Sequence, residues 1–86
     1  MEKKENYILL GIRKRHSSKS DRDYYVAYVL YENDYGFDVL IVMIKEEQVK
    51  PLEEAIQDDE FNLNEYIRLD YNSYNKRYDL KITYGL

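Results

Sequence analysis

Positive charge gathers in one short stretch of a chain whose net charge is −4. The sequence RKRHSSKSDR, at positions 13–22, holds five Lys or Arg side chains and a single Asp. A second basic pair, Lys76 and Arg77, ends the polar segment 72–77, NSYNKR. Guanidinium and ammonium groups bind phosphate oxygens, so two such clusters in an otherwise acidic chain predict an anionic ligand.

Tyrosine is the other unusual feature of the composition, with 11 Tyr, 2 Phe and no Trp. A Tyr ring can stack on a nucleobase while its hydroxyl stays in water. Tyrosine also favours β-strands, so a purely structural role explains the same residues. Tyr74 lies in the polar segment 72–77, where a core role is hard to assign, and it is the strongest stacking candidate.

Cationic and aromatic side chains together hold single-stranded nucleic acid, because cations follow the phosphates and rings stack on the bases. The sequence therefore predicts such binding through the basic loops 13–23 and 72–77. The phosphate candidates are Arg13, Lys14, Arg15, Lys19, Arg22, Lys76 and Arg77. The stacking candidates are Tyr24, Tyr28, Tyr31, Tyr74 and Tyr78. A solvated loop, made mobile by its serines, is the alternative interpretation of the longer basic run.

Catalytic and metal-binding chemistry is hard to build from this sequence. There is no cysteine, and the single histidine, His16, lies among cations with no second ligand nearby. Asp58, Asp59 and Glu60 are consecutive, so their side chains diverge, and Asp21 and Asp23 are expected to make local turn contacts or salt bridges beside Arg22. The chain has no P-loop, no dinucleotide-binding glycine pattern and no nucleophile elbow. We therefore expect a protein that is not an enzyme and that uses no cofactor or metal.

The first half of the chain predicts three β-strands. Residues 7–15, YILLGIRKR, form a short apolar run in which Gly11 indicates a bulge or bend. Residues 24–31, YYVAYVLY, are β-branched and aromatic, and ENDYGF supplies the residues of a hairpin turn. Residues 37–44, FDVLIVMI, are the most apolar segment and predict a central strand buried on both faces.

The second half predicts a helix and two further strands. In KEEQVKPLEEAIQ, residues 45–57, the apolar positions 49, 52, 55 and 56 follow helical spacing. Pro51 fits the first turn of this helix, with Glu53 and Glu54 near the positive end of its dipole. Apolar residues then alternate in EYIRLDY, residues 65–71, and in YDLKITY, residues 78–84.

These elements give the order β-β-β-α-β-β within a single domain covering residues 1–86. The predicted fold is mainly β with one short helix, and its order matches a five-stranded OB-like barrel. The same order also fits a βββα sheet followed by a separate hairpin, because order does not prove closure of a barrel.

From residue 7 to residue 84, the chain resembles the small OB-fold single-stranded DNA-binding proteins of phages and conjugative elements of Gram-positive bacteria. In the OB-fold, the loops that join strands 1–2 and 4–5 flank the ligand-binding face. Here those loops are RKRHSSKSDRD and NSYNKR. The resemblance implies that these two loops bind single-stranded nucleic acid and that the protein comes from a mobile element.

A second class of function is a small acidic inhibitor or adaptor that binds a protein. The segment EEAIQDDEF presents five acidic side chains. A strand edge is also exposed unless the barrel closes or a dimer covers it, and such an edge could pair with a partner. The sequence contains no signal-peptide pattern and no apolar run long enough to span a bilayer. We therefore expect a cytoplasmic protein without a membrane partner, acting alone or as a homo-oligomer.

Overall fold

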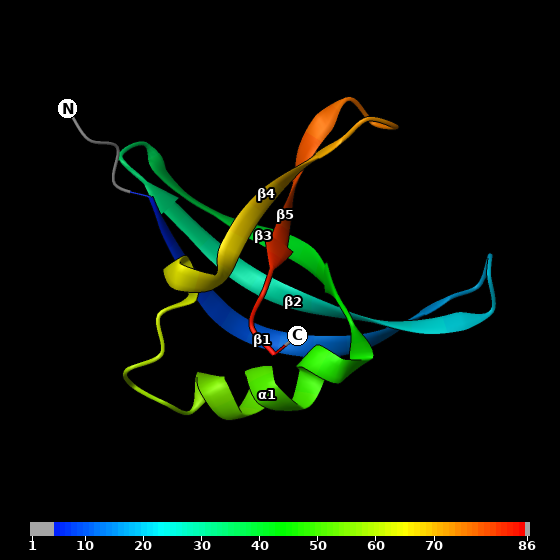
Figure 1. Ribbon diagram of the computed structural model, residues 1–86, viewed down its shortest axis with the longest axis horizontal. Coiled ribbons are helices and arrows are strands. Elements are labelled where there is room, and N and C mark those ends of the chain that lie inside the picture. Colours follow the sequence, from blue (N-terminus) through cyan, green and yellow to red (C-terminus); the bar gives the residue numbers. More distant parts are fainter. Residues whose placement is uncertain (1–4, 86) are drawn as a thin grey trace.

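The first three strands form one antiparallel sheet in the computed structural model, which describes residues 5–85. They are β1 (Asn6–Ser17), β2 (Arg22–Asn33) and β3 (Gly36–Ile44). The strand order is β1-β2-β3, so β2 is central, and the long β1–β2 hairpin projects away from the body of the molecule (Figure 1). The expectation of a mainly β protein with one short helix is confirmed.

The remaining elements pack against one side of this sheet. Helix α1 (Glu46–Ile56) lies below the sheet in Figure 1, and a short 3-10 helix, η1 (Leu63–Tyr66), leads into the second hairpin. That hairpin consists of β4 (Ile67–Asn72) and β5 (Arg77–Ile82), which form a separate two-stranded antiparallel sheet. Within residues 5–85, no helix is long and apolar enough to cross a bilayer.

The three-stranded sheet has an inner face that packs against α1, η1 and β5, and an outer face turned away from them. Side chains alternate between the faces, so the strand register assigns each residue to one of them. The core lies on the inner face and is completed by one buried residue from each of the three packing elements. Its buried members are Leu9, Ala27, Val29, Val42, Ile44, Leu52, Leu63 and Ile82.

Two local features of the sheet were predicted correctly. The pairing of β1 with β2 shifts between Leu9 and Gly11, which confirms a bulge at this point of the strand. Asn33 pairs with Gly36 across a two-residue hairpin, and the Asn33 side chain accepts a hydrogen bond of 2.8 Å from the Tyr35 amide. Gly36 has a φ of +139°, which a residue with a side chain rarely adopts.

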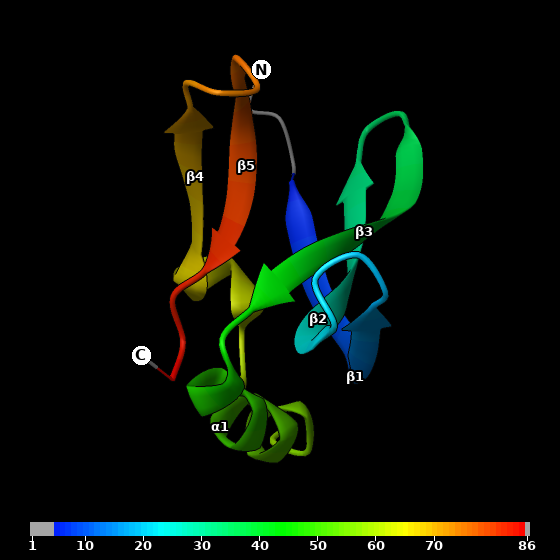
Figure 2. The ribbon, with the colours of Figure 1, turned by 90° about the vertical axis from the view of Figure 1, so that its right-hand side faces the viewer.

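The five strands do not close into a barrel among the described residues. No ladder joins β3 to β5, although the two strands lie in contact. An open groove of about 810 Å³ follows their seam, with Leu40 on one wall and Leu80 on the other. Asp38 also lines this groove, as does Asp79, which lies 3.5 Å from Arg77 Nε. The arrangement is therefore the alternative one, a βββα unit followed by a separate hairpin (Figure 2).

The expectation that residues 37–44 form a central strand buried on both faces is wrong. Strand β3 lies at the edge of its sheet, and its outward side chains Phe37, Val39, Ile41 and Met43 are 54–73% exposed. A continuous apolar run is compatible with burial on both faces, but also with one buried face and one apolar face left uncovered. The inward residues of the run, Val42 and Ile44, do lie in the core.

The predicted place of Pro51 in the helix is also wrong. Helix α1 begins at Glu46, so Pro51 lies inside it, and the acidic residues of the first turn are Glu46 and Glu47. The helix begins this early because the Gln48 side chain accepts a hydrogen bond of 3.0 Å from the Lys45 amide. The same side chain donates to the carbonyl oxygens of Ile82 and Tyr84, at 2.7 and 2.9 Å. Gln48 is 3% exposed and therefore ties α1 to the end of β5.

Candidate nucleic-acid interface

The strand register places several of the predicted binding residues on the outer face of the β1–β2 hairpin. Arg15 pairs with Tyr24, and Arg22 occupies the next outward row, opposite Ser17. Arg13 lies in the outward row on the opposite side of the Arg15–Tyr24 pair, where it pairs with Val26. The three arginines are exposed and Tyr24 is half-buried, so this end of the outer face combines free cations with an aromatic ring.

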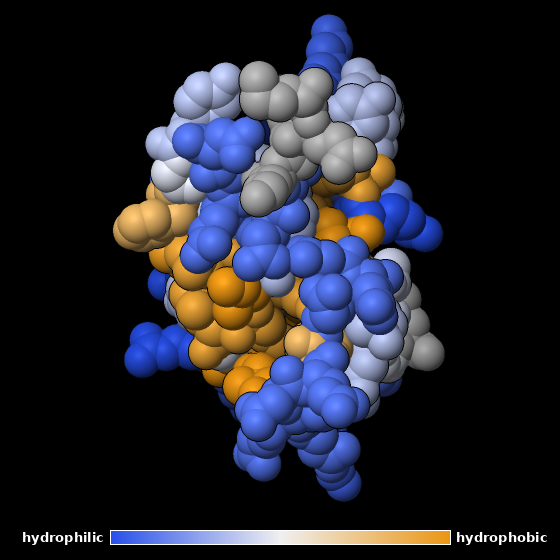
Figure 3. Space-filling model, turned by 90° about the vertical axis from the view of Figure 1, so that its left-hand side faces the viewer, coloured by the Kyte–Doolittle hydropathy of each residue, from blue (hydrophilic) through white to orange (hydrophobic). Residues whose placement is uncertain are grey.

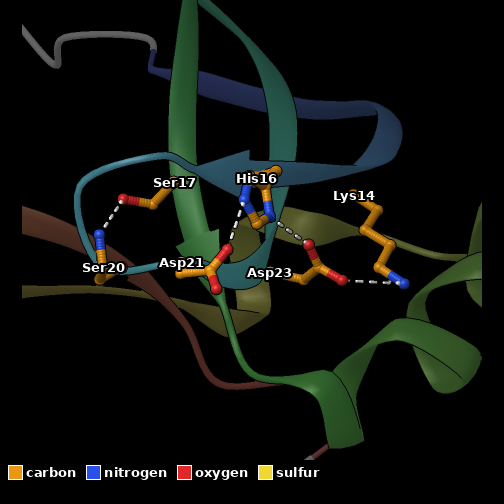
Figure 4. Close-up of polar contacts among 6 residues, drawn as sticks. All are labelled: Lys14, His16, Ser17, Ser20, Asp21 and Asp23. Carbon is orange, nitrogen blue, oxygen red and sulfur yellow. Dashed lines mark hydrogen bonds and ion pairs between the residues drawn. The ribbon is translucent and has the colours of Figure 1, made fainter.

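The intervening residues of the hairpin point to the other face and neutralise one another. His16 Nδ1 donates to Asp23 Oδ1 at 2.8 Å, and Lys14 Nζ lies 3.3 Å from Asp23 Oδ2 (Figure 4). His16 Nε2 lies 3.3 Å from Asp21 Oδ1. The expectation of local ion pairs at Asp21 and Asp23 is thus confirmed, with His16 and Lys14 as the partners instead of Arg22.

This network changes the titration of two of its members. The hydrogen bond from His16, followed by that from Lys14, lowers the pKa of the Asp23 carboxyl below its usual value. The hydrogen bond to Asp23 in turn raises the pKa of the Lys14 ammonium group. Lys14 is therefore charged but already paired, and its availability to a phosphate is reduced.

The cations of the hairpin that stay free are Arg13, Arg15, Lys19 and Arg22. None of the four takes part in an ion pair within residues 5–85. Lys19 lies in the exposed turn between the strands, where the Ser20 amide donates to Ser17 Oγ at 3.4 Å (Figure 4). The free positive charge thus lies along the outer face and at the tip of the hairpin.

The second basic segment forms the turn of the β4–β5 hairpin. Asn72 Oδ1 accepts hydrogen bonds from the amides of Tyr74 and Asn75, at 3.0 and 3.2 Å, and so fixes the turn. Tyr74 is 93% exposed, as expected for a residue outside the core. Arg77 Nε lies 3.5 Å from Asp79 Oδ1, which leaves Lys76 as the free cation of this turn in the described chain.

The two basic turns project from the same side of the molecule but diverge. Figure 1 shows both hairpins reaching to the right, the β4–β5 hairpin upward and the β1–β2 hairpin outward, and Figure 2 shows their tips well separated. The structure therefore brings Arg13, Arg15, Arg22 and Tyr24 together, while Tyr74, Lys76 and Arg77 form a second group.

The remaining stacking candidates have different surroundings. Tyr28 is half-buried on the outer face, between Gly11 and Ile41. Tyr31 lies on the inner face, with its ring centroid 5.0 Å from that of Tyr7. Tyr78 is 66% exposed and meets Tyr71 edge to face at 5.2 Å. Of the three, Tyr28 shares its face with the free arginines.

Apolar side chains on the outer face are the part of the site that sequence reasoning missed. Next to the arginines, the outward residues of β3 continue as an exposed apolar surface (Figure 3). FDVLIVMI is apolar at every position except Asp38, so its composition does not distinguish the two faces; strand geometry alone places the odd positions from Phe37 to Met43 on one face. No group of three or more His, Cys, Asp or Glu side chains in residues 5–85 could hold a metal ion.

Comparisons with known proteins assign no family to this arrangement. No protein-family model matches the chain, and no curated protein and no solved structure matches it either. The functional conclusion therefore depends on the geometry of the chain itself.

Proposed function

We propose that the protein binds single-stranded nucleic acid along the outer face of the β1–β2 hairpin. The observation that carries the proposal is the register, which sets Arg13, Arg15 and Arg22 on one face with Tyr24 among them. Free cations beside a half-buried ring match the two requirements of single-strand binding, phosphate neutralisation and base stacking. The element order is that of the OB-fold, although the two sheets do not form its closed barrel, so the proposal depends on the hairpin face and not on the fold.

The strand geometry suits a ligand that runs along the hairpin. Successive outward residues of one strand are about 6.8 Å apart, so Arg13 and Arg15 offer regularly spaced cations on a stiff support. Binding of this kind depends steeply on salt, because each neutralised phosphate releases bound counterions. The acidic remainder of the chain repels the ligand from other surfaces and so confines it to this face.

Titration of a fluorescent oligothymidine at several salt concentrations tests the proposal. Arg15→Ala should weaken binding and lower the slope of log affinity against log salt by about 0.7, the value for one phosphate on a single strand. Tyr24→Ala should cost about 1–3 kcal/mol of binding free energy and leave the slope unchanged, because stacking involves no counterions. Lys50→Ala, on the exposed side of α1, removes the same charge far from the hairpin and serves as the matched control.

Absence of binding by the native protein at low salt would contradict the proposal. An equal loss in Lys50→Ala and Arg15→Ala would show that net charge alone, and not the face, governs binding. Tyr74→Ala and Lys76→Ala measure the second hairpin separately. A loss there as large as in Tyr24→Ala would mean that the ligand spans both basic turns.

A protein-binding adaptor is the second candidate, favoured by the exposed acidic surface of α1 and the loop after it. Glu53, Glu54, Asp58, Asp59 and Glu60 are all exposed. None of them is ion-paired within the described part of the chain. Charge reversal at Glu53 and Glu54 would abolish capture of a basic protein partner and leave oligothymidine binding intact, so the two functions can be separated.

A further inference from the structure

The outer face of the three-stranded sheet carries a contiguous apolar patch. Three register rows define it, together with Phe37 in the row next to the β2–β3 turn. The outer apolar patch consists of Ile8, Leu30, Phe37, Val39, Ile41 and Met43. Five of these side chains are 40–73% exposed, and Leu30 is half-buried. Figure 3 shows apolar surface gathered on this side of the molecule, with hydrophilic surface around it.

The patch is large for the exposed surface of a small protein. At about 100 Å² for each half-exposed side chain, it presents roughly 500 Å² of apolar surface, near the upper end for the largest patch on a monomer. Leu10 at the bulge, 50% exposed, and the half-buried Tyr28 extend it. With its polar rim, this face approaches the roughly 800 Å² that each partner buries in a stable interface.

We infer that this patch is the interface of a homodimer, in which the outer faces of two copies pack against each other. A patch whose centre is apolar and uncharged matches itself, as an interface with twofold symmetry requires. Two sheets stacked in this way form a sandwich with a shared apolar layer. The inference does not depend on nucleic-acid binding, and it leaves Arg15, Arg22 and the hairpin tip beyond the last apolar row.

Charges at the two ends of the patch select one orientation of the copies. Glu32 lies in the row of Phe37 at one end, and Arg13 lies in the row of Met43 at the other. Neither is ion-paired within residues 5–85. A twofold axis between the rows of Val39 and Ile41, perpendicular to the strands, brings Glu32 of each copy opposite Arg13 of the other. With the axis parallel to the strands, like charges would meet.

Sedimentation equilibrium of the native protein without nucleic acid tests the dimer. We expect a monomer–dimer equilibrium, and Ile41→Asp should shift it to monomer by placing a carboxylate at the centre of the interface. Leu69→Asp is the matched control, because Leu69 is 58% exposed, close to the 57% of Ile41, but lies on the β4–β5 hairpin. Circular dichroism melting establishes that each variant is folded.

Charge exchange provides a test that keeps the apolar patch intact. Glu32→Arg or Arg13→Glu alone creates two like-charge contacts in each dimer and should weaken it about ten-fold, as expected for pairs at a solvated rim. The double variant E32R/R13E should recover the native dimer. An equimolar mixture of the two single variants should form a heterodimer, since both of its contacts then join opposite charges.

A native protein that stays monomeric at every accessible concentration would overturn the inference. So would a dimer that persists in Ile41→Asp and dissociates in Leu69→Asp, because the interface would then lie on the β4–β5 hairpin. A monomer whose oligothymidine binding is lost in Ile41→Asp would assign the patch to nucleic acid. Failure of the charge exchange to restore association would reject the proposed orientation.

Discussion

At the scale of single residues, the hairpin selects which of its cations remain available. The strand alternation sends Arg13 and Arg15 outward as free charges, and it sends Lys14 and His16 to the opposite face, where they meet Asp23. A paired ammonium group gains little from a phosphate, because it must first give up its carboxylate. Lys14→Ala should therefore reduce oligonucleotide affinity less than Arg15→Ala.

The lowered pKa of Asp23 gives a pH-dependent prediction. A depressed pKa means that the contribution of this carboxylate to hairpin stability is present above its ordinary value of 3.8 and is lost as the pH falls through the lower, folded value. His16→Ala should raise the Asp23 pKa toward 3.8, and Lys14→Ala should raise it less, since the His16 hydrogen bond is the larger cause. NMR titration of the Asp23 carboxyl carbon measures both shifts. An unchanged midpoint in His16→Ala would contradict the assignment of the network.

At the scale of elements, a single buried amide joins α1 to β5. Gln48→Ala leaves the Ile82 and Tyr84 carbonyls and the Lys45 amide without their side-chain partner. The bond to Ile82 is buried and the other two are part-buried; an unsatisfied buried group costs about 1–3 kcal/mol and a part-buried one less, so we expect a loss of about 2–4 kcal/mol in the free energy of unfolding. Urea denaturation measures it.

Gln48→Glu provides a second, pH-dependent variant of the same contact. Its carboxylate cannot donate and would face two carbonyl oxygens, so it should destabilise the fold at neutral pH. Protonation in acid would restore a donor and part of the stability. Glu47→Ala, on the exposed side of the same helical turn, is the control and should change stability by less than about 0.5 kcal/mol. Equal effects of Gln48→Ala and Glu47→Ala would mean that the buried contact contributes nothing.

The alternation of apolar residues and the turn-forming residues made most strands and turns predictable from the sequence. Which elements pack against one another was not predictable. The bulge near Gly11 and the Asn33–Gly36 hairpin follow from local backbone requirements, so the sequence alone indicates them. The place of Pro51 inside α1 follows from the bond between the Lys45 amide and Gln48, whose side chain is held in turn by bonds to residues 34 and 36 positions away. Such long-range bonds leave no periodic signal in the sequence.

At the scale of the whole molecule, the two sheets differ in how many residues each contributes to the core. The three-stranded sheet supplies five of the eight residues of the core cluster, whereas the β4–β5 hairpin supplies Ile82 alone. Toward the tip of the hairpin, Leu69, Tyr71 and Tyr78 are 56–66% exposed. Few buried contacts and an exposed backbone ladder are the conditions for local opening without global unfolding.

Hydrogen exchange should therefore separate the two sheets. We expect the hydrogen-bonded amides of residues 70–79 to exchange through local opening, a few kcal/mol below the free energy of global unfolding. Those of residues 26–30 in β2 should exchange only through global unfolding. Exchange measured by NMR against denaturant concentration distinguishes the two regimes. Uniform protection across both sheets would show that the hairpin and the sheet unfold as one unit.

The residue types of the candidate site were predictable from the sequence, but which of these residues lie together was not. The basic and aromatic residues were visible in the sequence, and the register then divided them between two faces and two diverging hairpins. The barrel failed as a prediction because closure depends on a β3–β5 ladder that neither strand specifies by itself. The exposed side of β3 was missed because an apolar residue at an interface between copies looks the same in sequence as one in a core.

The bulge at Leu10 determines which side chains of β1 lie on each face of the β1–β2 hairpin. Before it, Tyr7 and Leu9 lie on the inner face of the sheet, and after it the residues on that face are Ile12, Lys14 and His16. If Leu10 paired as an ordinary strand residue instead, every later residue of β1 would turn to the opposite face, so that Arg13 and Arg15 would point inward and Lys14 and His16 outward. The bulge therefore determines which basic side chains of β1 lie on the outer face, where a polyanionic ligand would bind.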